Sequence, residues 1–326
     1  MDFKSPLKKI GKALARKDIV AEFTVYIIKN NKILATDGRL VACCPLGFEC
    51  PDMLVPGDMF EKLINRLDSI DDITKMDGSR YTFKAGRSRG TIQVLQEFDT
   101  PSLPRPFADW KEPAPDFVDA LRRARPFISD NAVHPWAMSV CLGKDRMLAT
   151  NNIVLAEVEC VGAGGNGQLL PFWAVDFILG RDEELDGIQI HPEHMSFRFD
   201  DGSWLRTQLL IGEFPAVVLK MLTPENWKPG THELTNDWKE AYAQVAGVAE
   251  TSIEIYKDKI VGRSEKGYLE AEVDETPVPT GSEYSSWAVR YLTPVIEQAD
   301  WWAPDSFPQP ASFEADGIRG FVVGRR

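Results

Sequence analysis

The sequence predicts an α+β protein made of three copies of one repeat, and two internal matches are the first evidence for it. The stretch ILATDGRLVA at 33–42 recurs as MLATNNIVLA at 147–156, an offset of 114 residues. The stretch MLVPGDMFEKLI at 53–64 recurs as QLLPFWAVDFIL at 168–179, an offset of 115. Two matches of this length at nearly the same spacing indicate an internal duplication.

A third and fainter copy follows the first two. The tripeptide WAV at 173–175 reappears at 287–289, again 114 residues later, and FRFDDG at 197–202 is echoed by FEADG at 313–317. Proline-rich segments separate the copies, as is typical of linkers. We therefore predict three domains, with the boundaries 1–108, 109–226 and 227–326.

Each repeat follows the same order of elements. An amphipathic helix opens it, several strands and a second helix follow, and a hairpin closes it, which gives two helices on a strand-rich sheet. The opening helices are expected at 6–17, 115–128 and 235–247. The second helices are expected at 56–68, 171–181 and 285–299.

The closing hairpin of the first repeat contains a G-x-S-x-G pattern at Gly86, Ser88 and Gly90. In an α/β-hydrolase this pattern forms a turn between a strand and a helix that exposes a nucleophilic serine. Here RYTFKA before the turn and GTIQVLQ after it both alternate in the way of strands. We therefore expect a hairpin, no catalytic serine and no enzyme, with a hydrolase that uses Ser88 as the alternative.

A second pattern, GAGGNG at 162–167, matches the dinucleotide-binding fingerprint. That fingerprint requires a helix that begins at its last glycine, because the helix N-terminus holds the pyrophosphate. The next helix is expected only after QLLP, so we interpret the stretch as a connecting loop.

The composition indicates a globular protein of the cytoplasm that uses no cofactor. The 326 residues are 44% hydrophobic, and they include no apolar run of about 18 residues and no secretion signal. The five cysteines match no zinc or disulfide spacing, and the pair His191 and His194 has no third ligand nearby. We therefore expect reduced thiols, no metal site and no membrane partner.

The net charge of −12 argues against nucleic acid, but the charges are unevenly distributed. Residues 8–17 carry five basic side chains and no acidic one, whereas acidic residues gather in stretches such as RDEELDG and EAEVDETP. One surface can then hold a polyanion while the others repel it.

Several of these stretches together resemble the bacterial DNA polymerase III β sliding clamp. They are the hairpin YTFKAGRSRGTIQVL with FDTPSLP after it, the turn LATNNIVLAEV and the second joint LLIGEFPAVVLKML. In that family a Ser-Gly-Arg-Ser-Arg hairpin closes the first domain, and the second domain carries an Ala-Thr-Asp-Gly turn. The resemblance covers essentially the whole chain and is weakest in the third repeat. The chain is shorter than a typical bacterial member, which suits a phage-encoded clamp.

The resemblance implies three clamp-type domains in a non-enzymatic processivity factor. Two chains would join head to tail into a homodimeric ring around double-stranded DNA, hold a DNA polymerase there without sequence preference, and depend on a clamp loader. The helices would line the hole, where Lys and Arg meet phosphates. The residues expected to contact DNA are Lys8, Lys9, Lys12, Arg16, Lys17, Lys62, Arg66, Arg122, Arg123, Arg125 and Lys239.

The resemblance also implies a pocket between the second and third domains that binds short apolar peptides of partner proteins. The matching residues are Thr150, Asn152, Ile153, Val154, Leu155, Pro215, Val322 and Val323. The tail departs from the family, because it ends in GRR where the family has a Met-Pro-Met-Arg run. The alternative function is a clamp-fold interaction protein or decoy that does not encircle DNA.

Overall fold

The computed structural model describes residues 1–17, 20–67, 69–76, 79–95 and 103–325, and it confirms the α+β class. Within these ranges there are seven α helices and four antiparallel sheets. The chain forms two compact units. Unit 1 comprises Met1–Pro113 and Asp176–Leu209, and unit 2 comprises Ala114–Val175 and Leu210–Arg326.

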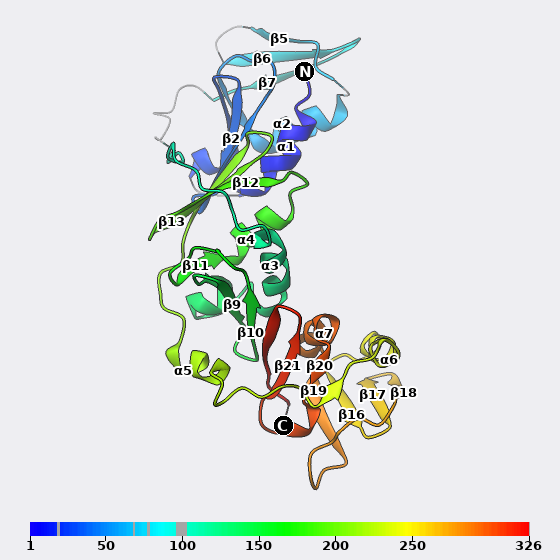
Figure 1. The fold of residues 1–326 in the computed structure, drawn as a ribbon. Helices are drawn as coiled ribbons and strands as arrows, with labels where there is room; N and C mark the ends of the chain where they lie inside the picture. The colour runs from blue at the N-terminus through cyan, green and yellow to red at the C-terminus, as the bar shows by residue number, and fades with distance from the viewer. Residues whose placement is uncertain (18–19, 68, 77–78, 96–102, 326) are drawn as a thin grey trace. The chain divides into compact units, whose positions relative to one another are not determined.

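Unit 1 contains a seven-stranded sheet built from two distant parts of the chain (Figure 1). In the order of the sheet, its strands are β12 (Leu185–Ile190), β13 (His194–Phe199), β14 (Trp204–Gln208), β3 (Leu40–Pro45), β2 (Lys32–Thr36), β1 (Val25–Lys29) and β4 (Met53–Pro56). The two parts join where β14 pairs with β3, with Leu205 opposite Ala42. Pairing between repeats therefore makes the sheet continuous.

A small sheet and two helices complete unit 1. The sheet consists of β5 (Asp72–Lys75), β6 (Arg80–Ala85) and β7 (Ser88–Gln93). Helix α1 (Lys4–Ile10) packs against β2 and β3, and α2 (Gly57–Arg66) packs against β4 and β7. The two helices also contact each other.

Unit 2 contains an eight-stranded sheet that again joins two parts of the chain. In order, its strands are β11 (Gln168–Pro171), β8 (Ser139–Leu142), β9 (Arg146–Thr150), β10 (Val154–Glu159), β22 (Ile318–Val322), β21 (Ala311–Ala315), β20 (Trp301–Trp302) and β15 (His232–Glu233). The parts join where β10 pairs with β22, with Leu155 opposite Phe321.

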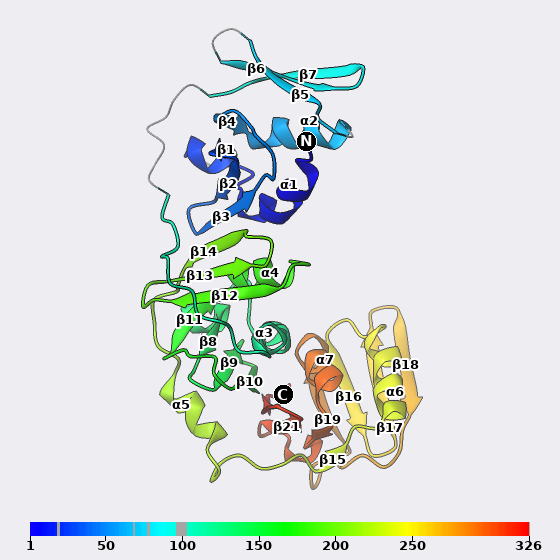
Figure 2. The same ribbon diagram turned by 45° about the horizontal axis from the view of Figure 1, so that its top comes forward.

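The second sheet of unit 2 has four strands, which are β18 (Gly267–Glu272), β17 (Lys259–Ser264), β16 (Ser252–Tyr256) and β19 (Tyr284–Ala288) in order. The remaining helices are α3 (Phe117–Ala124), α4 (Phe172–Leu179), α5 (Ala216–Leu219), α6 (Asn236–Ala246) and α7 (Val289–Gln298). Helix α3 packs against β9 and β10, and α6 packs against β17 and β18 (Figure 2). The chain passes from unit 2 to unit 1 within α4.

Local sequence explains where the helices form and stop. Helix α3 buries Phe117, Ala120, Leu121 and Ala124, which share one face of a helix with 3.6 residues per turn. Helix α6 begins at a threonine cap, because Thr235 Oγ1 accepts the N–H of Trp238 at 3.2 Å. The helix expected at 6–17 ends earlier, at Ile10, where a 3₁₀ turn from Gly11 follows.

The sheet order repeats one plan three times. In each repeat four strands form one group, whose edge strand is β3, β10 or β18. The closing hairpin and its neighbouring strands form a second group, whose edge strand is β7, β14 or β22. Strand β3 pairs with β14 and β10 with β22, so the second predicted domain contributes strands to both units. Within the described ranges β7 and β18 each have one strand partner. The predicted domain boundaries remain a prediction.

The turns repeat as closely as the sheets do. Thr36 Oγ1 donates to the carbonyl of Leu40 at 2.6 Å, and Thr150 Oγ1 donates to that of Val154 at 2.7 Å. The third residue of each turn is left-handed, with φ of 84° at Gly38 and 74° at Asn152. Asparagine can replace glycine here because it tolerates that conformation better than other residues with a Cβ.

Both misleading motifs lie where the sequence analysis placed them. Ser88 opens β7 after a tight turn, opposite Ala85, so a hairpin strand and not a helix follows it. The glycine-rich loop at 162–167 leads into β11 before α4 begins, so no helix starts at its last glycine. Within the described ranges, no helix is long and apolar enough to cross a membrane.

Candidate functional site

Lys9 of α1 belongs to a partly buried ion-pair network. Its Nζ lies 2.7 Å from Glu183 Oε1 and 2.6 Å from Asp201 Oδ2, and its side chain is 21% exposed. Arg181, which is 4% exposed, pairs with the same two carboxylates and stacks over the ring of Phe199. The network connects α1 to the β12–β14 part of unit 1, so the ion pairs of Lys9 hold two parts of the fold together.

The network fixes its protonation states at neutral pH. Burial alone lowers the pKa of Lys9, but its hydrogen bonds to Asp201 and Glu183 outweigh burial and raise the pKa above its ordinary value. Burial alone raises the pKa of both carboxyls. Hydrogen bonds from Lys9, with Arg181 for Glu183 and Ser203 for Asp201, outweigh it and lower both pKa values. Lys9 is charged, but its charge is already matched.

Most of the other basic residues predicted to contact DNA also have partners. Those with an acidic side-chain partner are Lys8 with Asp182, Arg16 with Glu61, Lys62 with Asp58, Arg122 with Asp119, Arg125 with Asp130 and Lys239 with Asp300. Arg123 donates to the carbonyl of Asp316 at 2.6 Å. Most of these pairs are exposed, and exposed pairs are worth only about 0 to 1 kcal/mol, so a phosphate can compete for them.

Lys12, Lys17 and Arg66 differ from this group. All three are exposed, and in the part of the chain that the structure describes no acidic side chain pairs with them. Lys12 lies in the turn after α1, and Arg66 lies in the last turn of α2, which contacts α1. These side chains give unit 1 exposed positive charge on and beside its helices, with Lys17 in a bend after the 3₁₀ turn at 11–13.

One further exposed cation was missed by the sequence reasoning. Arg290 lies in α7, and its guanidinium is 4.4 Å from the centre of the Tyr291 ring. The WAV match already placed this position on the second helix of the third repeat, and the second helix expected in the first repeat, at 56–68, carries Lys62 and Arg66. Helix α6, in contrast, carries Asp237 beside Lys239 and is not a basic helix.

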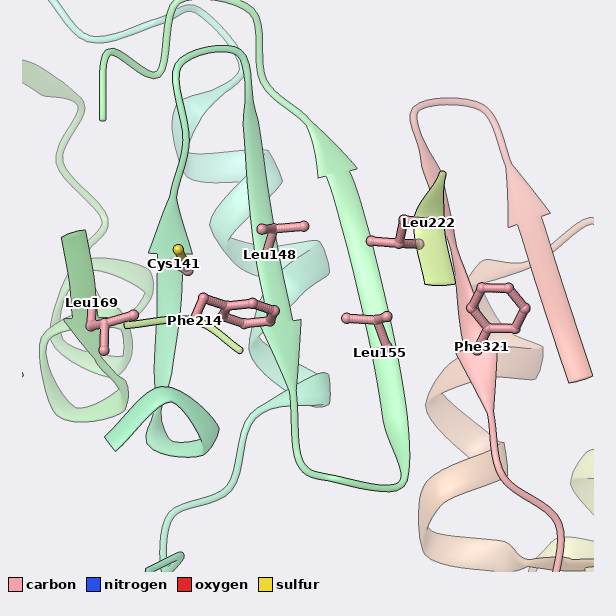
Figure 3. Close-up of a cluster of buried hydrophobic side chains, with 7 residues drawn as sticks. All are labelled: Cys141, Leu148, Leu155, Leu169, Phe214, Leu222 and Phe321. Atoms are coloured by element: carbon pink, nitrogen blue, oxygen red, sulfur yellow. The ribbon is translucent and has the colours of Figure 1, made fainter. Parts of the chain in front are cut away.

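An apolar cluster in unit 2 includes Leu155, one of the residues predicted for the peptide pocket. Figure 3 shows its buried side chains, which are Cys141, Leu148, Leu155, Leu169, Phe214, Leu222 and Phe321. They come from strands β8 to β11, from β22 and from the segment after β14. Partly buried side chains packed against them are Trp136, Leu210, Val218, Leu219, Met221 and Trp227. The cluster therefore consists of buried side chains with partly buried apolar side chains around them.

The predicted pocket residues divide between the two faces of this sheet. Leu155 belongs to the cluster. Val154 precedes Leu155 on β10, Val322 follows Phe321 on β22, and both valines are 1% exposed. Successive side chains of a strand point to opposite faces, so these valines face away from the cluster. Phe321, which the sequence reasoning did not name, is the residue of β22 that belongs to the cluster.

The other predicted pocket residues lie at the end of the β10–β22 pair and beside it. Thr150 is buried in the turn, Asn152 is exposed, and the carbonyl of Ile153 accepts the N–H of Val323 at 2.9 Å. Pro215 precedes α5 and follows the buried Phe214. The turn, the joint and the tail are therefore brought together around one apolar cluster.

The thiols are poorly suited to nucleophilic or metal chemistry. Four of the five cysteines are buried and all five are free. Burial raises the pKa of Cys43 to about 12 and that of Cys141 to about 11, so the reactive thiolate is scarce at neutral pH. His191 and His194 stack at 4.2 Å, and no group of metal-ligating side chains is found among the described residues.

Comparison with known proteins identifies the fold. No protein-family model and no curated protein sequence matches this chain. Several solved structures match it. A DnaN sliding clamp (DNA polymerase III subunit beta) from Bartonella birtlesii, bound to griselimycin, has a TM-score of 0.78 at 19% identity, with 100% of this chain and 98% of that chain covered.

Two more clamps show the same likeness. The DNA polymerase sliding clamp of Pseudomonas aeruginosa has a TM-score of 0.75 at 17% identity, over 98% of this chain and 96% of that one. The Helicobacter pylori β clamp bound to a DNA ligase peptide has a TM-score of 0.72 at 14% identity, over 99% and 97%. The chain therefore has the β sliding clamp fold along its whole length, as the sequence resemblance predicted.

Proposed function

We propose that this chain, which has the β sliding clamp fold, is itself a DNA sliding clamp that encircles duplex DNA and holds a DNA polymerase on it. The observation that carries the proposal is the full-length likeness to several clamps, combined with exposed cations on the helices of unit 1. An enzyme mechanism receives no support, because Ser88 lies at a hairpin and four of the five thiols are buried. The clamp would work in the cytoplasm with a loader that opens it.

The ring would consist of two chains joined head to tail, each with the domains 1–108, 109–226 and 227–326. A head-to-tail interface closes into a ring when its rotation closes. The repeated sheet order supports this, since each repeat is built to pair with the next. A monomeric chain at micromolar concentration would favour the decoy function instead.

The DNA contacts would come from the helical surface, and the structure ranks the candidates. Lys12, Lys17 and Arg66 are exposed without an acidic partner among the described residues, so they are free to meet phosphates. Lys9 is engaged by Glu183 and Asp201 and would contribute to folding instead. The remaining basic residues would leave their acidic or carbonyl partners and contact DNA phosphates instead.

The apolar cluster around Leu155 and Phe321 would bind partner peptides, including one from the polymerase. Its buried side chains are apolar, and partly buried apolar side chains such as Val218 and Met221 pack against them. Such a surface suits peptides with aliphatic and aromatic anchors. The Helicobacter pylori clamp was solved with a DNA ligase peptide, which supports a peptide-binding role for this fold.

Two matched charge reversals test the DNA surface. The first variant changes Lys12, Lys17 and Arg66 to Glu, and the control changes Lys29, Lys32 and Lys84, which are exposed on strands of unit 1, to Glu. Both variants have the same net charge. We expect the first to lose retention on circular duplex DNA and to show a shallower salt dependence, because fewer counterions are released. Equal losses in both variants would contradict a helix-lined DNA surface.

A further inference from the structure

Unit 1 contains a pocket of about 630 Å³ on one face of its seven-stranded sheet. Four side chains from neighbouring strands line it, which are Ile27 on β1, Leu34 on β2, Cys43 on β3 and Trp204 on β14. They are successive cross-strand partners, so they share one face of the sheet. Ligand sites commonly have volumes of about 300 to 1,000 Å³, so this pocket can hold several side chains of a ligand.

The pocket lies on the face of its sheet that corresponds to the apolar cluster in unit 2. The pair Ile27↔Leu34 recurs at an offset of 114 as Cys141↔Leu148. Cys141 and Leu148 both belong to that cluster. The pocket is therefore the counterpart, at the first joint between repeats, of the cluster at the second.

The segment 103–110, which also lines the pocket, has a fixed place in unit 1. The side chain of Gln189 accepts the N–H of Phe107 at 3.1 Å and donates to its carbonyl at 2.8 Å. Trp110 matches Trp227 of the second joint, because DWK around the first aligns with NWK around the second. Trp227 packs against the cluster, so each joint places a tryptophan beside the corresponding face of its sheet.

The two joints differ in charge. At the second joint Glu157 accepts from Arg146 at 2.6 Å and from Arg319 at 2.8 Å. The strand pairing places Lys32 and Cys43 at the positions that match Arg146 and Glu157, again at an offset of 114. The first joint therefore keeps a cation but has a thiol in place of the carboxylate.

Three cations of the pocket have no carboxylate partner. Lys29, Lys32 and Arg105 line it and are exposed, and among the described residues no acidic side chain pairs with them. Burial raises the pKa of the Cys43 thiol, and the positive charges of Lys32 and Arg105 act against burial, so both cations lie near this thiol. A fourth cation, Arg198, has an acidic partner. None of the described residues that line the pocket is acidic, although the whole chain has a net charge of −12.

The aromatic rings of the pocket favour a peptide over a single-stranded nucleic acid. Sites for single strands stack bases on open aromatic faces. Here the guanidinium of Arg198 lies 5.2 Å from the centre of the Trp110 ring, and that of Arg206 lies 5.8 Å from the centre of the Phe107 ring. These two rings already contact cations, so the pocket offers a ligand mainly aliphatic side chains, Trp204 and positive charge.

We propose that this pocket binds an acidic segment of a partner protein that carries one large apolar side chain. The carboxylates of the segment would meet Lys32 and Arg105, and its apolar side chain would lie against Leu34 and Trp204. Complementary charge speeds association and excludes partners of the wrong charge, so a basic segment would be rejected. The inference requires only the folded chain, so it does not depend on the ring or the DNA binding proposed above.

Selection from a phage-displayed library of random short peptides tests this inference on the full chain. We expect enrichment of peptides with several Asp or Glu residues around one leucine or aromatic residue. Fluorescein-labelled synthetic copies should bind the variant Lys32→Glu with Arg105→Glu at least about tenfold more weakly than the wild type, as measured by fluorescence anisotropy, because like charges then face each other. Both residues are exposed, so these changes open no core.

A matched control separates the pocket from general charge attraction. The variant Lys75→Glu with Lys84→Glu has the same net charge, but it alters exposed residues of β5 and β6 that do not line the pocket. It should bind the selected peptides as tightly as the wild type. Trp204→Ala should weaken binding, because the apolar side chain of the peptide loses its contact. Equal losses in the two charge variants, or full binding by Trp204→Ala, would overturn the proposed site.

A short fluorescein-labelled oligothymidylate tests the pocket for single-stranded DNA. It should bind the two charge variants equally. An oligothymidylate that loses affinity only in the pocket variant, and that displaces the selected peptides from the wild type, would make the pocket a nucleic-acid site and overturn the peptide. A selection that enriches no acidic peptide also overturns the inference, and it leaves the clamp function in place because DNA retention tests that function separately.

Discussion

Lys9 and Lys12 are three residues apart in the sequence, yet their surroundings differ. Lys9→Ala leaves Glu183 and Asp201 without their cation, so we expect it to reduce the free energy of unfolding by about 1 to 3 kcal/mol. Lys12→Ala should change it by less than about 0.5 kcal/mol and weaken DNA retention instead. Urea denaturation of both variants distinguishes the cases, and equal destabilisation would contradict the division.

The same network predicts a dependence of stability on pH. The pKa values of Glu183 and Asp201 are lowered by folding, so their contribution is complete above their ordinary pKa values and is lost as pH falls through the lowered ones. We expect the free energy of unfolding to fall as pH drops below the ordinary pKa values of these two carboxyls. Asp201→Asn should make that fall shallower. An unchanged slope in this variant would show that other carboxylates dominate.

Ser88 is predicted to have no chemical role. It begins an exposed strand, and no helix follows it to support a nucleophile. We expect Ser88→Ala to leave DNA retention and dimer mass unchanged. Labelling of the wild type, but not of this variant, by a serine-reactive fluorophosphonate would revive the hydrolase alternative.

Among the elements, β10 and β22 with the segment around α5 define the peptide-binding cluster. Val323 is exposed at the end of this pair, so Val323→Glu places a charge at the rim without opening the core. We expect an apolar clamp-binding peptide to bind at least about tenfold more weakly, as measured by fluorescence anisotropy. Val248→Glu, on an exposed side chain after α6, is the control. Equal binding to both variants would place the pocket elsewhere.

Sequence reasoning could predict the repeat, the hairpin at Ser88 and the turn at Thr150, because each is encoded by local periodicity or by special residues. It could not predict that Lys9 is engaged, since Glu183 and Asp201 lie far along the chain. It also named Val322 and not Phe321, since the face to which each side chain of β22 points depends on the pairing of that strand. Contacts between distant segments are set by tertiary structure.

At the scale of the whole molecule, the clamp fold covers the full chain although identity to solved clamps is below 20%. A fold of this kind persists when apolar positions, turns and strand register are kept, whatever the surface residues are. Charged residues on the surface can therefore be changed to test function without changing the fold. Function as a sliding clamp requires that two chains form a closed ring and that DNA threads this ring.

Threading is tested most directly on linear duplex fixed to a bead at one end, with the free end either open or capped by biotin and streptavidin after the protein is added. A threaded ring slides off an open end but cannot pass a cap. We expect the protein to survive a high-salt wash only on capped DNA, with two chains of 36.6 kDa per ring. Equal retention on open and capped DNA, or loss from both, would contradict the encircling clamp.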